Sequence, residues 1–219
     1  MLNTVFPKIH KEGYKFLAIS IIVTFLVLFF SQTLGLILIL ITIWVYYFFR
    51  DPERYSINDD NFLVSPADGL ITHISEQAGP MELQLENTTY TKISIFMNVF
   101  NCHVNRTPLT GTVEEIYYKP GKFLNASLDK ASEENERNYY KIKNNKLGEE
   151  IIIVQIAGLI ARRIVCEVEQ GQDLKQGDRI GMIRFGSRVD IYFKNKKPLV
   201  RKGQNVIAGE SLIAFNDGR

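Results

Sequence analysis

The dipeptide Gly186-Ser187 can react with its own backbone, and it lies between two predicted strands, Arg179–Arg184 and Val189–Phe193. Glycine has no Cβ to block an approaching nucleophile and tolerates a strained backbone. The Ser187 hydroxyl can therefore attack the carbonyl of Gly186 and convert the peptide bond into an ester. Elimination of the ester and loss of ammonia would leave a pyruvoyl group at residue 187. Taken alone, a Gly-Ser pair also fits an ordinary turn.

Serine is a weak nucleophile near neutral pH, so this reaction needs a base that a third group orients. The sequence offers His103, which follows a predicted strand, and Asp68, which precedes the β run Leu70–Ile74. Asp68 equally fits an Asp-Gly turn, and His103 equally fits a hydrogen-bonded histidine at a strand end. We predict that Asp68 and His103 assist Ser187.

The chain from Asn61 onward indicates a mainly β fold, because short β-branched and aromatic runs alternate with Gly, Pro, Asn and Asp. Asn144-Asn145 predicts a hairpin turn between Tyr139–Lys143 and Lys146–Ile153. Residues 125–135 fit a short helix or an ordered loop. The remaining expected strands are Lys92–Met97, Thr112–Tyr118, Glu150–Ile156, Ile164–Val168 and Ser211–Phe215.

A ten-residue pattern occurs twice, at Gly171–Ile180 and at Gly203–Leu212, with residues 185–188 between the copies. Each copy has two glycines, an acidic residue and then an apolar strand, and glycine suits turns with positive φ. The paired units resemble the hammerhead hairpins of lipoyl- and biotinyl-carrier domains, which implies a barrel-sandwich-like fold. A membrane-tethered carrier or adaptor is therefore the alternative to an enzyme. A carrier needs a modifiable lysine between acidic or Met neighbours, and no lysine here has them.

Two uncharged apolar runs, Phe16–Phe30 and Leu34–Phe49, predict a hydrophobic helical hairpin with a turn at residues 31–33. Each run covers about 22–24 Å as a helix against a hydrocarbon core of about 30 Å, so spanning and re-entrant insertion both stay open. Lys and Arg residues flank both outer ends, which predicts that both ends are cytoplasmic. We expect a membrane anchor at residues 1–50 and a β-rich catalytic domain at 51–219, on the cytoplasmic side of the cell membrane.

The composition argues against several other classes of protein. Lys and Arg number 26 against 24 Asp and Glu, and a net charge of +2 gives no broad basic field for nucleic acid. The two cysteines, Cys102 and Cys166, have no C-x-x-C spacing and are expected to be free thiols. Three histidines leave little material for a zinc site. We expect neither a metal ion nor a nucleic-acid partner.

Four short motifs follow one another in the chain: Phe48–Arg54, Ser65–Gly69, His103–Pro108 and Phe185–Ser187. This ordered set resembles the short bacterial and archaeal phosphatidylserine decarboxylases, and the resemblance runs from about residue 48 to the carboxyl end. The resemblance implies a proenzyme that cuts itself between Gly186 and Ser187 into a β chain, 1–186, and an α chain, 187–219. These chains would stay partners.

The same resemblance implies the reaction and its cofactor. Ser187 would become a covalent pyruvoyl group, the electron sink for converting phosphatidylserine in the membrane to phosphatidylethanolamine and carbon dioxide, without pyridoxal phosphate. Asp68 and His103 would be catalytic, with His103 protonating the carbanion. Longer members carry a second histidine where this chain has Arg106, so it stays open whether His103 serves both self-cleavage and decarboxylation. Another serine phospholipid as substrate, such as an ether lipid, and a homo-oligomer also stay open.

Overall fold

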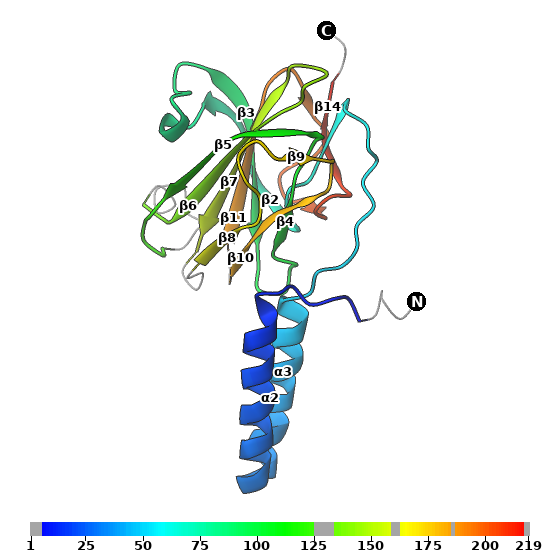
Figure 1. Cartoon of the computed structure of the whole chain (residues 1–219), viewed down its shortest axis with the longest axis vertical. Helices are drawn as coiled ribbons and strands as arrows, with labels where there is room; N and C mark the ends of the chain where they lie inside the picture. Colours follow the sequence, from blue (N-terminus) through cyan, green and yellow to red (C-terminus); the bar gives the residue numbers. More distant parts are fainter. Residues whose placement is uncertain (1–5, 125–133, 159–162, 185–186, 217–219) are drawn as a thin grey trace. The chain divides into compact units, whose positions relative to one another are not determined.

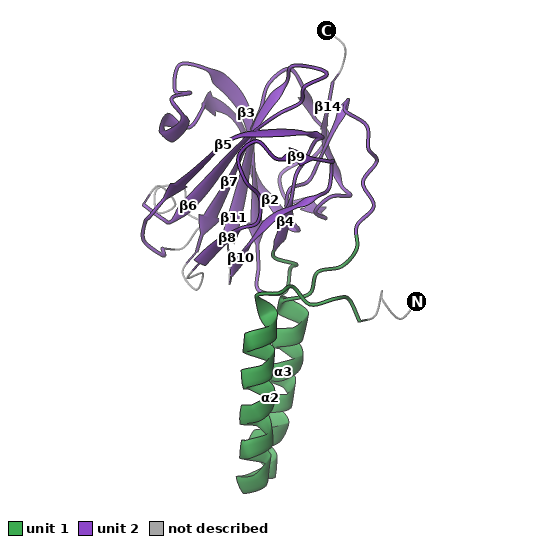
Figure 2. Ribbon diagram, viewed as in Figure 1, with its two compact units in different colours: residues 1–53, 100–103 green, residues 54–99, 104–219 purple. Residues whose placement is uncertain are grey.

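The computed structural model describes residues 6–124, 134–158, 163–184 and 187–216. The chain forms two compact units (Figures 1 and 2). One unit comprises Met1–Glu53 and Phe100–His103, and the other comprises Arg54–Val99 and Val104–Arg219. Residues 125–133 of the segment predicted as a short helix or ordered loop lie outside the described residues.

The first unit contains the predicted hydrophobic hairpin, formed by α2 (Gly13–Phe30) and α3 (Gln32–Phe48). Ser31 alone separates the two helices, with an extended backbone and a side chain in the N-cap position of α3. Serine favours this position because its oxygen can accept from a free backbone N–H. A Cβ at Gly35 would lie 2.2 Å from the Leu28 side chain, so glycine lets the two helices pack closely.

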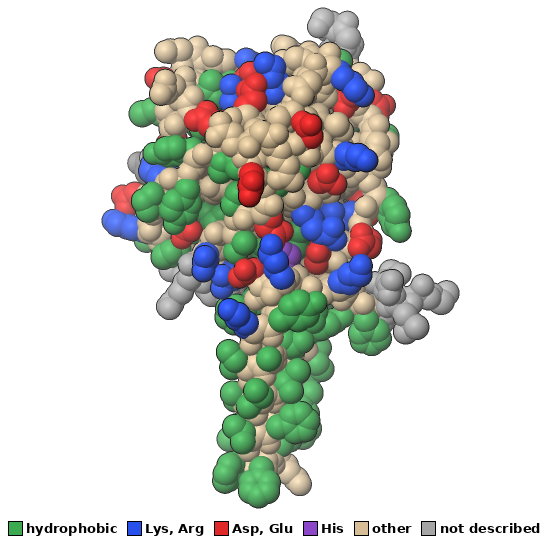
Figure 3. Space-filling view, viewed as in Figure 1, with side chains coloured by type: hydrophobic (Ala, Val, Ile, Leu, Met, Phe, Trp, Pro, Cys, Tyr) green, Lys and Arg blue, Asp and Glu red, His purple; other side chains and the backbone are tan. Residues whose placement is uncertain are grey.

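The outer surface of the hairpin is apolar. Figure 3 shows one face of α2 and α3 covered by hydrophobic side chains, and residues 16–49 contain no Asp, Glu, Lys or Arg. In contrast, Thr24 and Thr42 turn inward and share a hydrogen bond of 2.9 Å between the helices. Gly13–Phe30 is long and apolar enough to cross a membrane, whereas Gln32–Phe48 is a shorter apolar helix.

The second unit is built around an eight-stranded antiparallel sheet in the order β13-β2-β3-β11-β7-β6-β5-β9. Strand β11 therefore lies in the interior of the sheet, between β3 and β7. The eight strands are β2 (Gly69–Ala78), β3 (Thr89–Met97), β5 (Gly111–Lys119), β6 (Arg137–Lys143), β7 (Glu150–Ala157), β9 (Asp173–Leu174), β11 (Ser187–Phe193) and β13 (Asn205–Val206).

Two smaller sheets complete the β unit, in the orders β1-β14-β12 and β4-β10-β8. A 3-10 turn, η1 (Met81–Leu83), follows β2. The six strands are β1 (Phe62–Val64), β4 (Val104–Arg106), β8 (Arg163–Cys166), β10 (Arg179–Arg184), β12 (Lys197–Pro198) and β14 (Leu212–Phe215).

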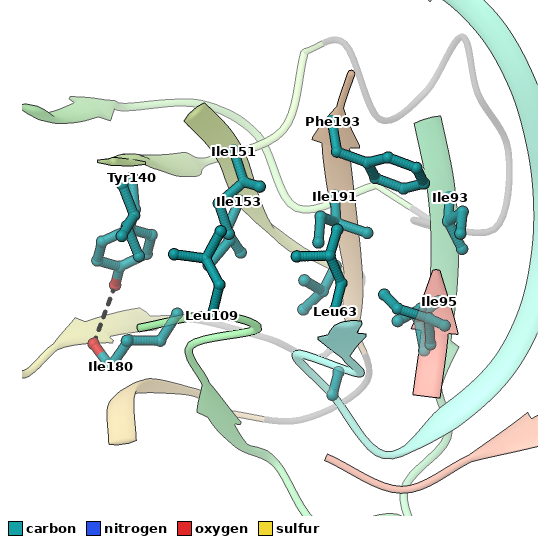
Figure 4. Packing of buried hydrophobic residues seen from close by; sticks show 14 of the residues in the cluster. Leu63, Ile93, Ile95, Leu109, Tyr140, Ile151, Ile153, Ile180, Ile191 and Phe193 are labelled. Atoms are coloured by element: carbon teal, nitrogen blue, oxygen red, sulfur yellow. Dashed lines mark hydrogen bonds between the residues drawn. The ribbon is translucent and has the colours of Figure 1, made fainter. Parts of the chain in front are cut away.

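The large sheet is buried on both faces along its central strands. In β7, Ile151 and Ile153 belong to the main core, whereas Ile152 and Val154 belong to a second cluster on the opposite face. This alternation follows from the period of two in a strand. Figure 4 shows the main core, where side chains from β3, β7 and β11 gather with Leu63 and with residues of the smaller sheets.

The prediction of a mainly β fold with an apolar helical hairpin is confirmed, and each predicted strand coincides with an observed one within a few residues. The predicted start of a strand at Lys146 is wrong, because β7 begins at Glu150. The reason is local: the Asn144 side chain accepts hydrogen bonds from the backbone of Lys146 and Leu147, which holds the turn open.

The repeated ten-residue pattern is a repeated structure. The first copy contains β9 and leads into β10, and the second contains β13 and leads into β14. Gly177 and Gly209 occupy the same place in the two copies, with φ values of 88° and 75°. Positive φ is unfavourable for residues with a Cβ, which explains the glycine at both positions.

Candidate active site

Ser187 is the first residue of β11 and is completely buried. Its backbone lies opposite Met97 of β3 on one side and Ala157 of β7 on the other. The side chain faces the main core, since Val189 and Ile191 on the same face of β11 belong to it. The predicted cleavage partner, Gly186, lies outside the described residues.

A chain of buried polar side chains leads to Ser187. The Ser187 hydroxyl lies 3.6 Å from the Met97 sulfur, and the Asn105 side-chain amide lies 3.7 Å from the same sulfur. Gln155 donates to Asn105 Oδ1 at 2.8 Å, and the Tyr140 hydroxyl donates to Gln155 Oε1 at 2.7 Å. All five side chains are buried, so this polar chain crosses an otherwise apolar core.

Asp68 lies in the turn between β1 and β2 and is tied to two other segments of the β unit. Its carboxylate accepts from Nη2 of Arg54 at 3.0 and 3.3 Å and from the backbone N–H of Ala208 at 2.8 Å. The second guanidinium nitrogen of Arg54 lies 3.7 Å from Glu210. Asp68 therefore joins Arg54 to Ala208 in the second copy of the repeat.

His103 belongs to the other unit and is fully buried there beside Phe48, with 4.3 Å between the ring centroids. Nδ1 lies 2.9 Å from the carbonyl oxygen of Asn101. Because a carbonyl can only accept, Nδ1 carries the proton and Nε2 has a free lone pair. Among the described residues, Nε2 has no hydrogen-bond partner.

Burial lowers the pKa of His103 to about 3, because the charged imidazolium loses its hydration. The bond to Asn101 acts in the opposite direction, and the charge of Arg50 adds to the lowering. His103 is therefore neutral near pH 7, which is the form that can accept a proton from a hydroxyl. The role that a triad carboxylate would have at Nδ1 is filled here by a backbone carbonyl.

The basic residues near these motifs bind other groups of the protein. Arg188 is buried and forms two short bonds to Asp190, at 2.6 and 2.7 Å. Arg106 is also buried and donates to the carbonyl of Gly177 at 2.8 Å. Arg106 thus fixes the turn of the first repeat copy.

The sequence predicts Ser187, Asp68 and His103 as site residues, but it does not single out Asn105, Gln155 or Tyr140. Asn105 stands inside the His103–Pro108 motif, and that proximity is the signal that could have drawn attention to it. Gln155 interrupts an apolar strand, which is a weaker signal. Asn105, Gln155 and Tyr140 reach Ser187 only because strands distant in the sequence pair with one another, so the link can be recognised only once the fold is known.

The fold and the site together define a mainly β protein with a buried serine at the head of a central strand and an apolar amino-terminal hairpin. Residues 41–214 match the family described as phosphatidylserine decarboxylase. The chain therefore belongs to the phosphatidylserine decarboxylase family, as its motifs predict.

Three relatives are similar over nearly the whole chain, and each is named phosphatidylserine decarboxylase proenzyme. The protein of Pelagibacter ubique is 68% identical over 214 residues, which cover 98% of this chain and 99% of the relative. The protein of Rickettsia akari is 50% identical over 213 residues, covering 97% and 92%. The protein of Cereibacter sphaeroides is 50% identical over 215 residues, covering 98% and 92%.

Proposed function

We propose that this chain is the proenzyme of a pyruvoyl-dependent decarboxylase that converts phosphatidylserine to phosphatidylethanolamine and carbon dioxide. The observation that carries the proposal is the position of Ser187, buried at the head of β11 in a chain of this family. Cleavage at Gly186-Ser187 would give a β chain of residues 1–186 and an α chain of residues 187–219. The names of the relatives support phosphatidylserine as the substrate and a processed precursor.

The proposed self-cleavage consumes one water molecule and releases one molecule of ammonia. Ser187 Oγ attacks the Gly186 carbonyl carbon, the C–N bond breaks, and the amine of residue 187 takes a proton. The ester then loses the Cα proton of residue 187, and the Cβ–O bond breaks to release the carboxylate of Gly186. Water adds to the tautomer of the resulting dehydroalanine, ammonia leaves, and a pyruvoyl group remains at the head of the α chain.

His103 is proposed as the base that takes the Ser187 proton. Its neutral ring and free Nε2 lone pair fit that role, because an unassisted serine hydroxyl is hardly ionised at neutral pH. Protonating a carbanion during decarboxylation would require His103 to gain a proton first. The surroundings described here favour its base form, so the structure supports the first role more directly than the second.

Position 187 suits a pyruvoyl group. The residue has no exposed surface, is fixed by strand pairing on both sides, and contacts the Met97 sulfur, which the Asn105 amide also contacts. When formed, the group supplies an electron sink for the departing carboxyl group. The surrounding protein residues would exclude water from position 187, and strand pairing would hold the first residue of β11 in place.

The apolar hairpin is proposed to anchor the enzyme in the cell membrane, where its substrate is dissolved. The uncharged surface of α2 and α3 supports this location, and the basic residues outside both helices favour cytoplasmic ends. The catalytic β unit would then lie on the cytoplasmic side. The carrier alternative has less support, because the family match covers the β unit and no lysine has the neighbours of a carrier lysine.

The intact mass of the purified protein tests this function directly. Wild type should give two chains that separate at Gly186-Ser187, and the smaller chain should resist Edman degradation because a pyruvoyl terminus has no amine. The purified two-chain protein should release carbon dioxide from phosphatidylserine vesicles. Ser187→Ala should stay a single chain. A wild-type chain that stays full-length in detergent and in lipid would contradict the pyruvoyl mechanism.

A further inference from the structure

We propose that Tyr140, Gln155 and Asn105 form a directed hydrogen-bond chain that places an amide N–H donor at residue 187 to stabilise the negative charge formed during self-cleavage. This inference rests on the proposed function and assigns a role to three residues outside the Asp68, His103 and Ser187 set. Asn105 would supply the donor, and Gln155 and Tyr140 would be positioning residues.

The direction of the chain follows from its first member. The Tyr140 hydroxyl lies 2.7 Å from Gln155 Oε1 and 3.3 Å from the carbonyl oxygen of Ile180 (Figure 4 shows the second bond). Both neighbours are acceptors, so Tyr140 is the donor. Burial raises the pKa of Tyr140 well above its usual value, which keeps the O–H proton in place.

The donor and acceptor ends of each amide are fixed by the hydrogen bond that precedes it in the chain. With its oxygen facing Tyr140, Gln155 can only present its NH₂ group to Asn105, and it donates to Oδ1 at 2.8 Å. Asn105 must then present its own NH₂ group on the side of Met97, at 3.7 Å from the sulfur. The reverse orientation would set the Asn105 oxygen against the lone pairs of a thioether.

At the last member of the hydrogen-bond chain, the amide N–H of Asn105 faces a weak acceptor, the Met97 sulfur. A thioether sulfur accepts hydrogen bonds poorly, so the Asn105 N–H is incompletely satisfied in a core where buried polar groups are normally bonded. The Ser187 hydroxyl touches the same sulfur at 3.6 Å. When the hydroxyl attacks, negative charge develops on the attacked carbonyl oxygen, and a preorganised donor nearby stabilises it.

The fold supports this placement from two sheets. Gln155 lies opposite Val189 in the pairing of β7 with β11, so it shares the inner face with Ser187 two residues along. Asn105 comes from β4, which pairs with β10 through Gly181. A Cβ at Gly181 would lie 3.2 Å from the Tyr140 hydroxyl and 2.1 Å from the Val165 carbonyl, so glycine leaves room for the head of the chain.

Cell-free synthesis of the full-length chain with lipid vesicles tests the inference, since conversion to two chains can be followed from the first minutes. Removal of an oxyanion donor typically slows a reaction by about 10²–10³-fold, and we expect a loss of that size for Asn105→Ala. Asn105→Asp keeps the shape but replaces the donor with an acceptor, so it should be equally slow. Tyr140→Phe should slow conversion by about 2- to 10-fold, the equivalent of one buried hydrogen bond.

Asn144→Ala is the matched control, because Asn144 is a buried asparagine that caps the turn before β7. It should convert at the wild-type rate. Hydroxylamine adds a readout specific to the step, because it cleaves esters and leaves peptide bonds intact under mild conditions. It should release little extra fragment from Asn105→Ala, since that variant is arrested before the ester forms.

The outcomes separate the inference from the function on which it rests. A wild-type chain that never converts contradicts the proposed function. If wild type converts and a folded Asn105→Asp converts as fast, Asn105 has only a packing role and the inference is wrong. The same conclusion follows if Asn144→Ala is as slow as Asn105→Ala. Should the Asn105 variants fail to fold, a wild-type rate in Tyr140→Phe would still overturn the directed chain.

Discussion

Nη2 of Arg54 donates to both carboxylate oxygens of Asp68, at 3.0 and 3.3 Å, with both side chains largely buried. A buried charge that loses its partner usually costs more than the pair contributes, about 3–5 kcal/mol. Asp68 therefore has a structural partner in addition to the role proposed for it with His103. The two roles predict different patterns among variants.

The first prediction follows from the motifs, which assign Asp68 and His103 to the same step: Asp68→Asn and His103→Ala should slow self-cleavage alike, by about 10²–10⁴-fold, the usual worth of general-base assistance. Arg54→Gln should slow cleavage much less, while lowering the free energy of unfolding of a Ser187→Ala chain. Conversion rates and denaturant unfolding measure the two effects. If Asp68→Asn instead resembles Arg54→Gln in both assays, Asp68 serves only the ion pair, and Asn101 alone orients His103.

The second prediction concerns pH. The pKa of His103 lies below that of a histidine in the unfolded chain, so between about pH 6.5 and about 3 the unfolded state binds a proton that the folded state does not. His103 therefore contributes stability above pH 6.5 that is lost as the pH falls through this window. Unfolding of Ser187→Ala should become easier on acidification, and adding His103→Gln should flatten that dependence. Equal slopes for both proteins would show that the ring has the same pKa in the folded and the unfolded state, which would contradict the lowered pKa.

The third prediction separates anchoring from catalysis. Replacing exposed apolar residues of the hairpin with serine should move the protein from the membrane fraction to the soluble fraction without slowing self-cleavage. The residues to replace are four of the most exposed ones, Phe25, Phe29, Phe30 and Leu40. Deleting residues 1–49 should move the protein to the soluble fraction and should also slow self-cleavage, because the deletion removes Phe48, which packs against His103. A multiple serine variant that stays in the membrane after a carbonate wash would argue against the hairpin as anchor.

The fourth prediction uses two glycines of the first repeat copy. Gly171 and Gly177 both have positive φ, at 85° and 88°, but a Cβ meets nothing at Gly171 and would lie 1.9 Å from the Ser56 hydroxyl at Gly177. Gly171→Ala should cost about 1–2 kcal/mol for the left-handed backbone alone. Gly177→Ala should cost more, since Ser56 must also move. Thermal unfolding in the Ser187→Ala background measures both, and equal losses would mean that Ser56 adapts freely.

Much of the fold was predictable because it depends on local patterns. The apolar runs around Ser31, the β-branched runs and the glycines of the repeat each act through backbone conformation within a few residues. Short strands such as β4 and β13 carry too little pattern to predict, since their pairing with β10 and β2 defines them. The turn at Asn144 was predicted in the right place, but the strand after it was predicted to start too early, because side-chain capping lengthens the turn.

Candidate site residues with distinctive chemistry can be proposed from the sequence alone. Residues that reach the candidate site only through strand pairing cannot. Ser187 follows a glycine and lies between two strand patterns, and both features can be recognised in the linear sequence. The chain from Tyr140 to Asn105 joins β6, β7 and β4, and neutral amides in strands have no distinctive spacing. The hydrogen bond of His103 to Asn101 and the ion pair of Asp68 with Arg54 likewise depend on backbone geometry.

The segment that would become the α chain is interleaved with the rest of the β unit. β11 lies between β3 and β7, β13 pairs with β2, and β14 pairs with β1. A cut before Ser187 breaks none of these ladders, so the two pieces would stay together. Cleavage would nevertheless change how the protein refolds. The uncut chain would refold at a rate independent of protein concentration, whereas two separated pieces must first associate, so their refolding rate would depend on concentration. Once matured, the enzyme would depend on never unfolding.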